Sequence, residues 1–558
     1  MQAPAIIEER NEKRPIDDVD PEDQEGGDDD DDDEQARILA MIEGDEEEGT
    51  DFNAADLKKL VLGFEKKLYK NQQMRVRYPD EPTKFLESEM DLSDDIQGLN
   101  VIATAPDLFA TLVQLKVLPS ILGLLSHDNT DIALSAVALL SEILDADTLS
   151  ESPEDAEILL KAMHDAQLLP LLFQNLERLN ESNREDAEGV HKTLTILENL
   201  CEIDDNTPSL MLKGTKMLPW IRRRLLTKGL DANKLYCSEL LSIILQTSKE
   251  SRRKLATENG IDDLLRILAG YRNKDPQTPE EVEYLNNLFD SVTTTLLESE
   301  GKKHFLQGEG VELMIIMLRE KKMAVFGAMK ALSFATTGDE VAMCKRFVEK
   351  RGLKSLFPRF MKVPKNAKGV ADKGEYEEHV CSVLNSLLRN IRDSTLRNRL
   401  LNKFVEDNFA KVERLIELHL QYSEKVAKED HEIARETVAY LAEEKSKGDE
   451  HPEIPPEMTD MFYLRRLENG LCCLQLVDSI IAEIMVAGIP QIRGKIKKLL
   501  AQQERSLYGV IDVLDEFASM MGEETTLNSS STAKVSREKA HIQDLVSKLQ
   551  DGGMSSKD

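Results

Sequence analysis

Six polar residues in recurring amphipathic segments are the side chains whose type and spacing could do chemistry in this sequence. Amides and carboxylates set at intervals along a helical surface can hydrogen-bond the backbone of an extended peptide and pair with its basic side chains. A solvated helix face carries the same residue types, so both interpretations stay open at this point. The six residues are Glu142, Asn199, Ser242, Ser333, Asn385 and Asn390.

Motifs for catalysis, metals or cofactors are not found. The nine histidines are scattered without metal-ligand spacing, no Gly-x-Ser-x-Gly elbow is present, and the six cysteines form no Cys-x-x-Cys pair, which favours buried thiols in a reducing compartment. The stretch GIPQIRGKI (residues 488–496) has five residues between its glycines and Ile after its Lys, so it cannot form a phosphate-binding loop. We therefore predict a non-enzymatic protein with no catalytic residues, no cofactor and no metal.

The charge of the chain favours basic partners. The formal net charge is −33, and residues 1–50 contain 21 acidic and four basic residues, so about half of the excess lies in this leader. A nucleic-acid-binding surface needs a basic face, so direct nucleic-acid binding is disfavoured. No signal peptide follows Met1 and no apolar run approaches the length of a membrane span, which predicts a soluble, intracellular protein with no membrane partner.

The elements that carry the six polar residues repeat along the chain. Segments beginning at Lys116, Gln167, Lys216, Gly260, Gly310 and Gly352 start 51, 49, 44, 50 and 42 residues apart. Each contains a bulky apolar residue at one shared position: Ile121, Leu172, Ile221, Leu265, Ile315 and Phe357. A period of 40 to 50 residues with two or three helices is typical of armadillo and HEAT repeats, in which each unit needs a neighbour to cover its apolar face.

A polar turn and a further amphipathic helix follow each repeated segment. In SHDNTD (residues 126–131) we expect Asn129 or Thr130 to cap the helix that follows, and DANKL at Asp231 is the counterpart two repeats later. These turns offer no chemistry of their own. The helix after the turn is the third of its repeat and is expected to line the concave face, where the six polar residues would lie.

These patterns predict an all-α fold, an armadillo/HEAT-like right-handed superhelical solenoid with helical caps at both ends. We expect a disordered acidic leader over residues 1–52, an N-terminal helical cap over 53–100 and about six armadillo-type repeats over 101–402. A C-terminal helical cap should span 403–521, and residues 522–558 should form a mostly disordered tail with a short helix over 535–549.

Several longer blocks resemble the beta-catenin-like protein 1 family. FEKKLYKNQQMRVRYPDEPTKFLESEMDL (residues 64–92), ATAPDLFATLV, GLLSHDNTD, DANKLYCSE, EEHVCSVLNSLLRN, FYLRRLENGL and IPQIR occur in order. The resemblance runs from about residue 57 to 515, and the repeat pattern alone does not require these letters. It implies a nuclear armadillo-repeat protein associated with the spliceosome. Family members join the NineTeen complex beside its Cdc-five-like subunit and bind basic nuclear-localisation-type peptides of splicing factors.

The implied function agrees with an acidic body that carries a peptide groove. Groove carboxylates would meet Lys and Arg of the peptide, Asn side chains would hold its backbone, and the single Trp would stack on a basic stem or pack in the core. The groove candidates are Glu142, Asn199, Glu202, Trp220, Glu239 and Asn385. The basic import cluster of the family is reduced here to Lys13 and Arg14, a weak nuclear-import signal.

Two other functions stay open. A nuclear-import adaptor of karyopherin-alpha type would repeat a Trp and Asn pair along its third helices, whereas this chain has one Trp and irregular Asn. A direct RNA-binding solenoid would need a basic surface, for which WIRRRLLTK, with Arg222 to Arg224, is the concentrated candidate. Homodimerisation through one end, the register of the bound peptide, and coverage of the groove by the leader are left open by the sequence.

Overall fold

The computed structural model describes residues 52–213, 215–320, 322–364, 373–447, 453–521 and 529–554. All regular secondary structure in these ranges is helical, which confirms the predicted all-α, armadillo-type fold. Lys13, Arg14 and the predicted acidic leader, apart from Phe52, lie outside the described residues.

The chain divides into two compact units, and each is described here by itself. The first comprises Met1–Ile121 and Asp147–Ala166, and the second comprises Leu122–Ala146 and Gln167–Asp558. In the first unit, α2 packs against α3 through Leu57, Val61 and Phe64, and a capping box between Asn53 and Asp56 begins α2. Its elements are α2 (Ala54–Arg77), η1 (Pro82–Lys84), α3 (Leu86–Gly98), η2 (Leu99–Thr104), η3 (Pro106–Leu108), α4 (Phe109–Gln114), α7 (Ala146–Glu151) and α8 (Pro153–Asp165), with α5 (Leu118–Gly123) at its boundary.

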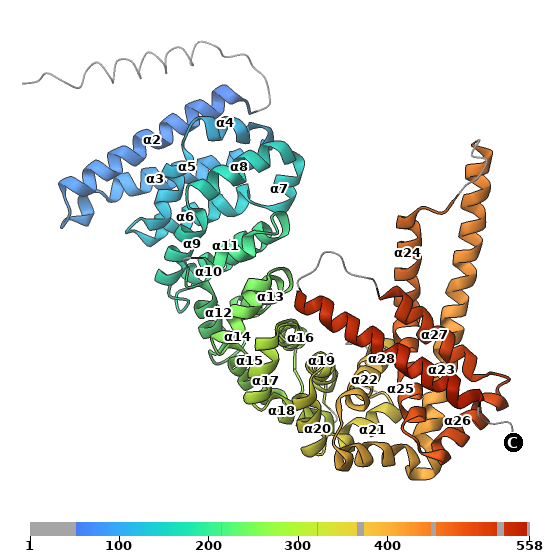
Figure 1. The fold of residues 1–558 in the computed structure, drawn as a ribbon. Helices are drawn as coiled ribbons and strands as arrows, with labels where there is room; N and C mark the ends of the chain where they lie inside the picture. Colours follow the sequence, from blue (N-terminus) through green and yellow to red (C-terminus); the bar gives the residue numbers. More distant parts are fainter. Residues whose placement is uncertain are drawn as a thin grey trace, which may run out of the picture. The chain divides into compact units, whose positions relative to one another are not determined.

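The second unit stacks repeats of three helices. First helices are α11 (Thr207–Leu212), α14 (Lys249–Thr257), α17 (Ser299–Gln307) and α20 (Val341–Glu349). Second helices are α9 (Leu168–Arg178), α12 (Met217–Leu225), α15 (Gly260–Leu268), α18 (Gly310–Arg319) and α21 (Leu353–Met361). Third helices are α6 (Thr130–Ile143), α10 (Arg184–Ile203), α13 (Ala232–Thr247), α16 (Pro279–Thr295), α19 (Val325–Thr336) and α22 (Lys373–Asn390), and short turns η4 (Leu124–Ser126) and η5 (Ala269–Tyr271) complete the repeats (Figure 1).

A left-handed corner before the second helix recurs in both units. The corner residues have φ near +60°, which costs energy for a residue with a Cβ and is kept only where the surrounding packing requires it. In three repeats the next residue is glycine, and a Cβ on Gly310 would lie 2.5 Å from the ring of Phe305 on the first helix. The corner therefore allows the first and second helices to pack closely. The corner residues are Lys116, Gln167, Asn259, Glu309 and Arg351.

The shared apolar position and the predicted caps are confirmed. The exposed fraction is 4% or less at all six positions: Ile121, Leu172, Ile221, Leu265, Ile315 and Phe357. Asn129 caps α6 by accepting a hydrogen bond from the Asp131 amide, and Asp231 caps α13 by accepting one from the Lys234 amide.

The C-terminal helices close the second unit. They are α23 (Ser394–Ser446), α24 (Pro456–Arg466), the π-helical turn η7 (Leu467–Leu471), α25 (Cys472–Val486), α26 (Pro490–Gln502), α27 (Leu507–Met520) and α28 (Ser529–Met554). Helix α23 leaves helical geometry at residues 406–409, where Asp407, Asn408 and Phe409 have positive φ. The stretch Pro456–Val486 is long and apolar enough to span a membrane, but 72% of its most apolar window is buried inside the protein, as expected of a core helix.

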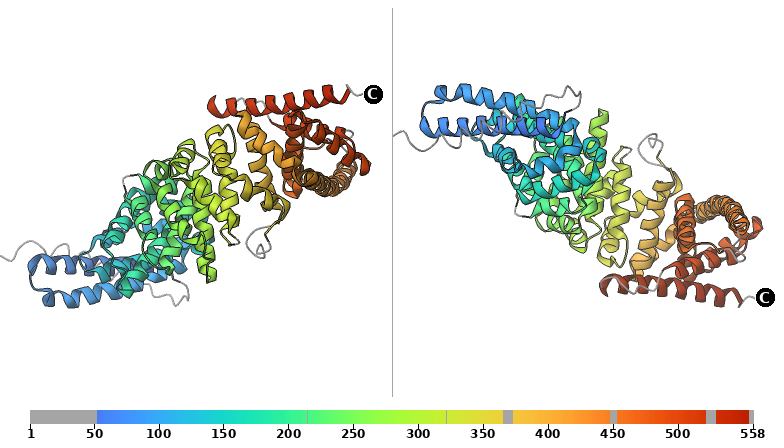
Figure 2. Two further views of the ribbon diagram at one scale, coloured as in Figure 1. Left: turned by 90° about the horizontal axis from the view of Figure 1, so that it is seen from below. Right: turned by 90° about the horizontal axis from the view of Figure 1, so that it is seen from above.

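The structure differs from the sequence prediction at the tail. Helix α28 covers residues 529–554, whereas the sequence predicted a mostly disordered tail with a short helix over 535–549. It packs against α25 and α27 (Figures 1 and 2), and it buries Ile542, Leu545, Val546 and Leu549. Burial of each such side chain contributes about 1.5–3 kcal/mol, which offsets the entropy cost of ordering the segment.

Candidate functional site

The third helices of the second unit form one continuous layer, which we call the third-helix ladder: α6, α10, α13, α16, α19 and α22. Each packs against the next along the chain (Figure 1). Side chains on the open face of one helix are therefore expected near those of its neighbours. Glycine allows one of these approaches, because a Cβ on Gly327 of α19 would lie 2.2 Å from the ring of Phe289 on α16. A ladder built in this way presents a row of side chains to an extended ligand.

Four glutamates of three adjacent ladder helices make this row acidic, and we call them the acidic face: Glu198 and Glu202 of α10, Glu239 of α13 and Glu283 of α16. Glu202 and Glu283 are exposed, and Glu198 and Glu239 are partly exposed. Tyr236 Oη donates a short hydrogen bond to Glu198 Oε2. None of the four glutamates forms an ion pair with any residue in the ranges that the structure describes. The acidic face is therefore charged and uncompensated by these residues.

The electrostatics of the acidic face show that its charges oppose one another. Partial burial raises the pKa of the Glu239 carboxyl above its usual range, and the nearby charges of Glu198 and Glu283 raise it further. Like charges held together cost free energy unless a positive group is placed between them. A cation bound at this position would remove that repulsion.

A polar pocket continues the ladder beyond the acidic face. It has a volume of about 250 Å³ and lies among α16, α19 and α22, with Asn286, Asp290, Lys330 and His379 in its lining. Lys330 Nζ lies 2.9 Å from Asp290 Oδ1, so this carboxylate is compensated. Burial lowers the pKa of His379, although Glu375 opposes the effect, so His379 adds no positive charge near neutral pH.

The structure distributes the six predicted groove residues over different environments. Glu202 and Glu239 belong to the acidic face, Glu142 is exposed on α6, and Asn385 is partly buried on α22. Trp220 lies partly buried on α12, a second helix, and so is not part of the third-helix ladder. The predicted grouping is therefore only partly reproduced, and the binding role of these residues stays a prediction.

Asn199 has a structural role that the sequence analysis did not predict. Its side chain is 9% exposed, and Nδ2 donates a 2.9 Å hydrogen bond to the Leu144 carbonyl at the end of α6. Asn390 of α22, four ladder helices further on, does the same by donating to the Gly338 carbonyl after α19 at 2.8 Å. Both amides fasten neighbouring repeats, because a carbonyl at a helix end has no partner within its own helix. The bond to Leu144 occupies one donor of the Asn199 amide, and the contact of Asn199 with peptide backbone stays a prediction.

The exposed and partly exposed glutamates of the ladder lie close in sequence to the six polar residues that the sequence pattern singled out. Ser242 and Ser333 are buried, like Asn199 and Asn390. The sequence analysis missed Glu198, one residue before Asn199, and Glu283. The helical phase of the apolar residues in α10, read over its whole length, is the signal that would have placed Glu198 outside.

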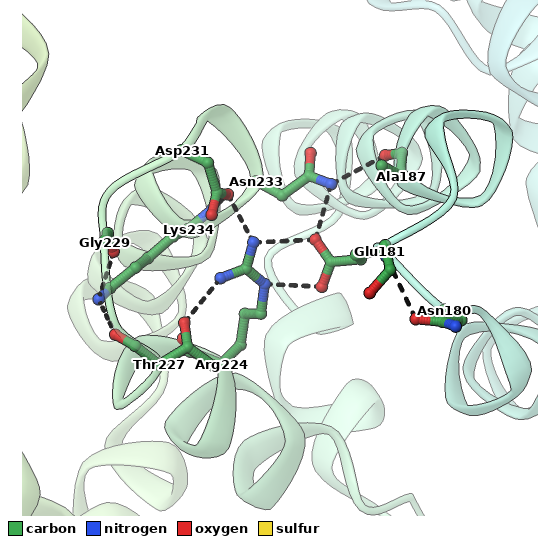
Figure 3. A network of polar contacts seen from close by, with 10 residues as sticks. Asn180, Glu181, Ala187, Arg224, Thr227, Gly229, Asp231, Asn233 and Lys234 are labelled. Atoms are coloured by element: carbon green, nitrogen blue, oxygen red, sulfur yellow. Dashed lines mark hydrogen bonds and ion pairs between the residues drawn. The ribbon is translucent and has the colours of Figure 1, made fainter.

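The basic candidate for RNA binding is largely neutralised by contacts between repeats. Figure 3 shows Arg224 of α12 held between Glu181 and Asp231, with Nε 2.6 Å from Glu181 Oε1 and Nη2 2.9 Å from Glu181 Oε2. Arg222 pairs with Asp263 of α15, its Nε lying 2.9 Å from Oδ2. Arg223 is exposed. Two of the three arginines thus serve the packing of repeats.

Catalytic chemistry has little support in the described ranges. They contain no group of three or more His, Cys, Asp or Glu residues placed to hold a metal ion. His419 Nδ1 lies 2.6 Å from Asp478 Oδ1, but both residues are buried between α23 and α25, and burial raises the pKa of Asp478 to about 6. Five of the six free cysteines are buried, and Cys472 is partly exposed. The buried groups are therefore interpreted as packing contacts of the core.

Comparison with known proteins agrees with the fold. A family model described as "Catenin-beta-like, Arm-motif containing nuclear" matches residues 36–515. Beta-catenin-like protein 1 of Rattus norvegicus is 45% identical over 482 residues, covering 84% of this chain and 82% of the relative. The Homo sapiens protein of that name is 45% identical over 481 residues, with the same coverage. The beta-catenin-like protein 1 homolog of Schizosaccharomyces pombe is 30% identical over 484 residues, 86% of this chain and 81% of the relative.

The match extends over most of both chains, includes all the repeats, and confirms the resemblance found in the sequence. The chain therefore belongs to the beta-catenin-like protein 1 family of Arm-motif proteins, which the family model describes as nuclear.

Proposed function

We propose that this chain is a non-enzymatic nuclear scaffold associated with the spliceosome, and that its third-helix ladder binds basic nuclear-localisation-type peptides of splicing factors. Partners of this kind include proteins of the NineTeen complex, in particular the Cdc-five-like subunit. The family description as nuclear supports the location. The spliceosomal partners follow from the sequence resemblance.

One observation carries the peptide-binding part of the proposal: Glu239 of α13 has Glu198 of α10 and Glu283 of α16 as charged neighbours, and burial first and then these two charges raise its pKa. Lys and Arg side chains of an extended peptide would relieve this repulsion and form charge-assisted hydrogen bonds. Each such contact would add to the affinity for a basic peptide, and binding would require no catalytic step.

The two alternative functions have less support. A karyopherin-alpha-type groove needs repeated Trp and Asn pairs, whereas Trp220 lies on a second helix and Asn199 is engaged by a neighbouring repeat. An RNA-binding surface needs free cations, whereas Arg222 and Arg224 are paired with carboxylates.

Calorimetric titration of the full chain with Lys/Arg-rich peptides from splicing factors, against charge-matched scrambled peptides, tests the proposal. An exposed ion pair contributes about 0.2–1 kcal/mol, so removing three charges should weaken binding by about 3- to 150-fold. Selective binding that weakens with salt is expected, and the test variant replaces Glu198, Glu239 and Glu283 by Gln. The control variant replaces three exposed glutamates outside the ladder by Gln: Glu177, Glu250 and Glu424.

Equal loss in both variants, or equal binding of scrambled peptides, would reduce the effect to general attraction by an acidic protein. For the spliceosomal part, the tagged chain should co-purify with NineTeen subunits from nuclear extract, and the test variant should recover less of them than the control variant.

A further inference from the structure

A second pocket, of opposite character to the acidic face, lies among the C-terminal helices. It has a volume of about 230 Å³ and lies among α26, α27 and the end of α28. Leu500, Ile511 and Leu549 are buried and supply an apolar lining, and Tyr508 at its edge is 68% exposed. The exposed ring of Tyr508 borders the apolar lining, where it can contact a side chain that enters the pocket.

Two cations belong to the lining of this pocket, Lys497 and Arg505. Neither forms an ion pair with a residue within the described parts of the chain, whereas Lys495 on the same helix pairs with Glu413 at 2.6 Å. Helix α26 contains four basic residues and no acidic residue, in a chain of net charge −33. Among the residues that the structure describes, the lining of the pocket therefore contains two cations and no carboxylate in an otherwise acidic chain.

The backbone fixes where one of these cations lies. Glu504 has φ of +53°, and the Arg505 amide donates a 3.0 Å hydrogen bond to the Leu500 carbonyl, which closes the end of α26. Helix α27 begins two residues later, and its N-cap residue Ser506 makes no side-chain capping bond. The partial positive charge of this helix start adds to the two side chains beside the pocket.

We propose that this pocket, "the cap pocket", docks a partner segment that presents one large apolar side chain flanked by carboxylates. The apolar lining and Tyr508 would receive the apolar side chain, and Lys497 and Arg505 would pair with the flanking carboxylates. The choice of an acidic partner rests on charge complementarity. The protein would then use two surfaces of opposite charge, the acidic face for basic peptides and the cap pocket for acidic ones.

The probe is a fluorescein-labelled peptide of aspartate and glutamate with one central phenylalanine, and the matched probe carries alanine in its place. Fluorescence anisotropy with the full chain should show tighter binding of the phenylalanine peptide. The double variant Lys497→Gln/Arg505→Gln should weaken this binding roughly tenfold, because two exposed charge contacts are lost. Lys498→Gln, an exposed lysine of the same helix outside the lining, should change it by less than about twofold.

A photoreactive benzoyl group on the phenylalanine should crosslink to α26, α27 or α28. Equal binding of the phenylalanine and alanine peptides, no binding at all, or an equal effect of Lys498→Gln would overturn the proposal. The substituted side chains are not core residues, so the variants should fold like the original chain. Circular dichroism melting checks this. Binding of basic peptides to the acidic face is measured in the same variants and should be unchanged, so a failure of the cap pocket is distinguishable from a failure of the proposed function.

Discussion

Replacement of Arg224 by Met should loosen the junction between two repeats while leaving the rest of the chain folded. The side chain of Arg224 is 12% exposed, and its fork meets both oxygens of Glu181, which belongs to the turn between α9 and α10 (Figure 3). Met keeps most of the packing volume but removes the hydrogen bonds and the charge. The change therefore isolates the polar contact between the repeats.

The magnitude follows from the exposure of the groups left behind. A hydrogen bond to a charged group contributes about 1.5–3 kcal/mol, and Glu181, which is 23% exposed, keeps only the bond from Asn233 Nδ2 at 3.0 Å. The side chain of Asp231 is 52% exposed and is easily rehydrated, so the loss of its ion pair with Arg224 costs less than about 1 kcal/mol. We expect a total local destabilisation of about 2–3 kcal/mol.

Hydrogen exchange measured by mass spectrometry is the suitable assay, because repeats open locally and a single global free energy of unfolding is not well defined for such chains. Faster exchange is expected in the α9–α10 and α12–α13 turns and not in α22 or α25. Arg223→Met, at an exposed neighbouring position, should change exchange little. The reasoning fails if Arg224→Met leaves both turns as protected as before, or if a double-mutant cycle with Glu181→Gln gives a coupling energy below about 0.5 kcal/mol.

Two further predictions concern stability. Gly301→Ala should lower the local free energy of opening around α17 by about 1–3 kcal/mol, because the new Cβ would lie 2.1 Å from the Thr295 carbonyl oxygen. Gly63→Ala on α2, where nothing lies within 4 Å of the new Cβ, should raise the local stability of that helix by about 0.5–1 kcal/mol. Hydrogen exchange measures both changes, and unchanged exchange around α17 in Gly301→Ala would contradict the packing argument. Glu239→Gln should raise the melting temperature at pH 7 and not at pH 4. Burial and the charges of Glu198 and Glu283 raise the pKa of Glu239, so its ionisation disfavours the folded state; this cost is absent below the usual value of 4.5 and is complete above the raised value. A gain that persists at pH 4 would show that ionisation of Glu239 is not the cause.

The repeat architecture could be predicted because each repeat contains the same apolar and capping residues within a short segment of sequence. The apolar residue at positions such as Ile221 and Ile315 recurs wherever a second helix must be covered by the next repeat, and both are buried. Asp231 and Asn129 satisfy the free amides at helix starts, which any helix of this kind requires. Both features can be recognised from residues within a few helical turns of each other in the sequence.

The candidate site was less predictable because it depends on contacts between repeats. Asn199 and Glu198 are adjacent polar residues on α10, yet Asn199 is buried and bonds a carbonyl 55 positions earlier in the chain, whereas Glu198 is partly exposed and accepts a hydrogen bond from Tyr236. Helix α10 packs against both α6 and α13, so its buried surface is broad and a polar residue within it does not stand out. Helix α28 was underestimated for a related reason, since its apolar positions gain their partners only from α25 and α27.

The position of α28 has a consequence for how the protein is made on the ribosome. Repeats need only their neighbours, so they can fold in order as they leave the exit tunnel, but the surface of α25 and α27 that receives Ile542 and Val546 stays uncovered until residues 529–554 have been translated. A chain stalled or truncated before residue 529 carries that apolar surface into the cell uncovered. Nascent chains of this length therefore expose the kind of apolar surface that makes folding intermediates prone to aggregation until α28 covers it.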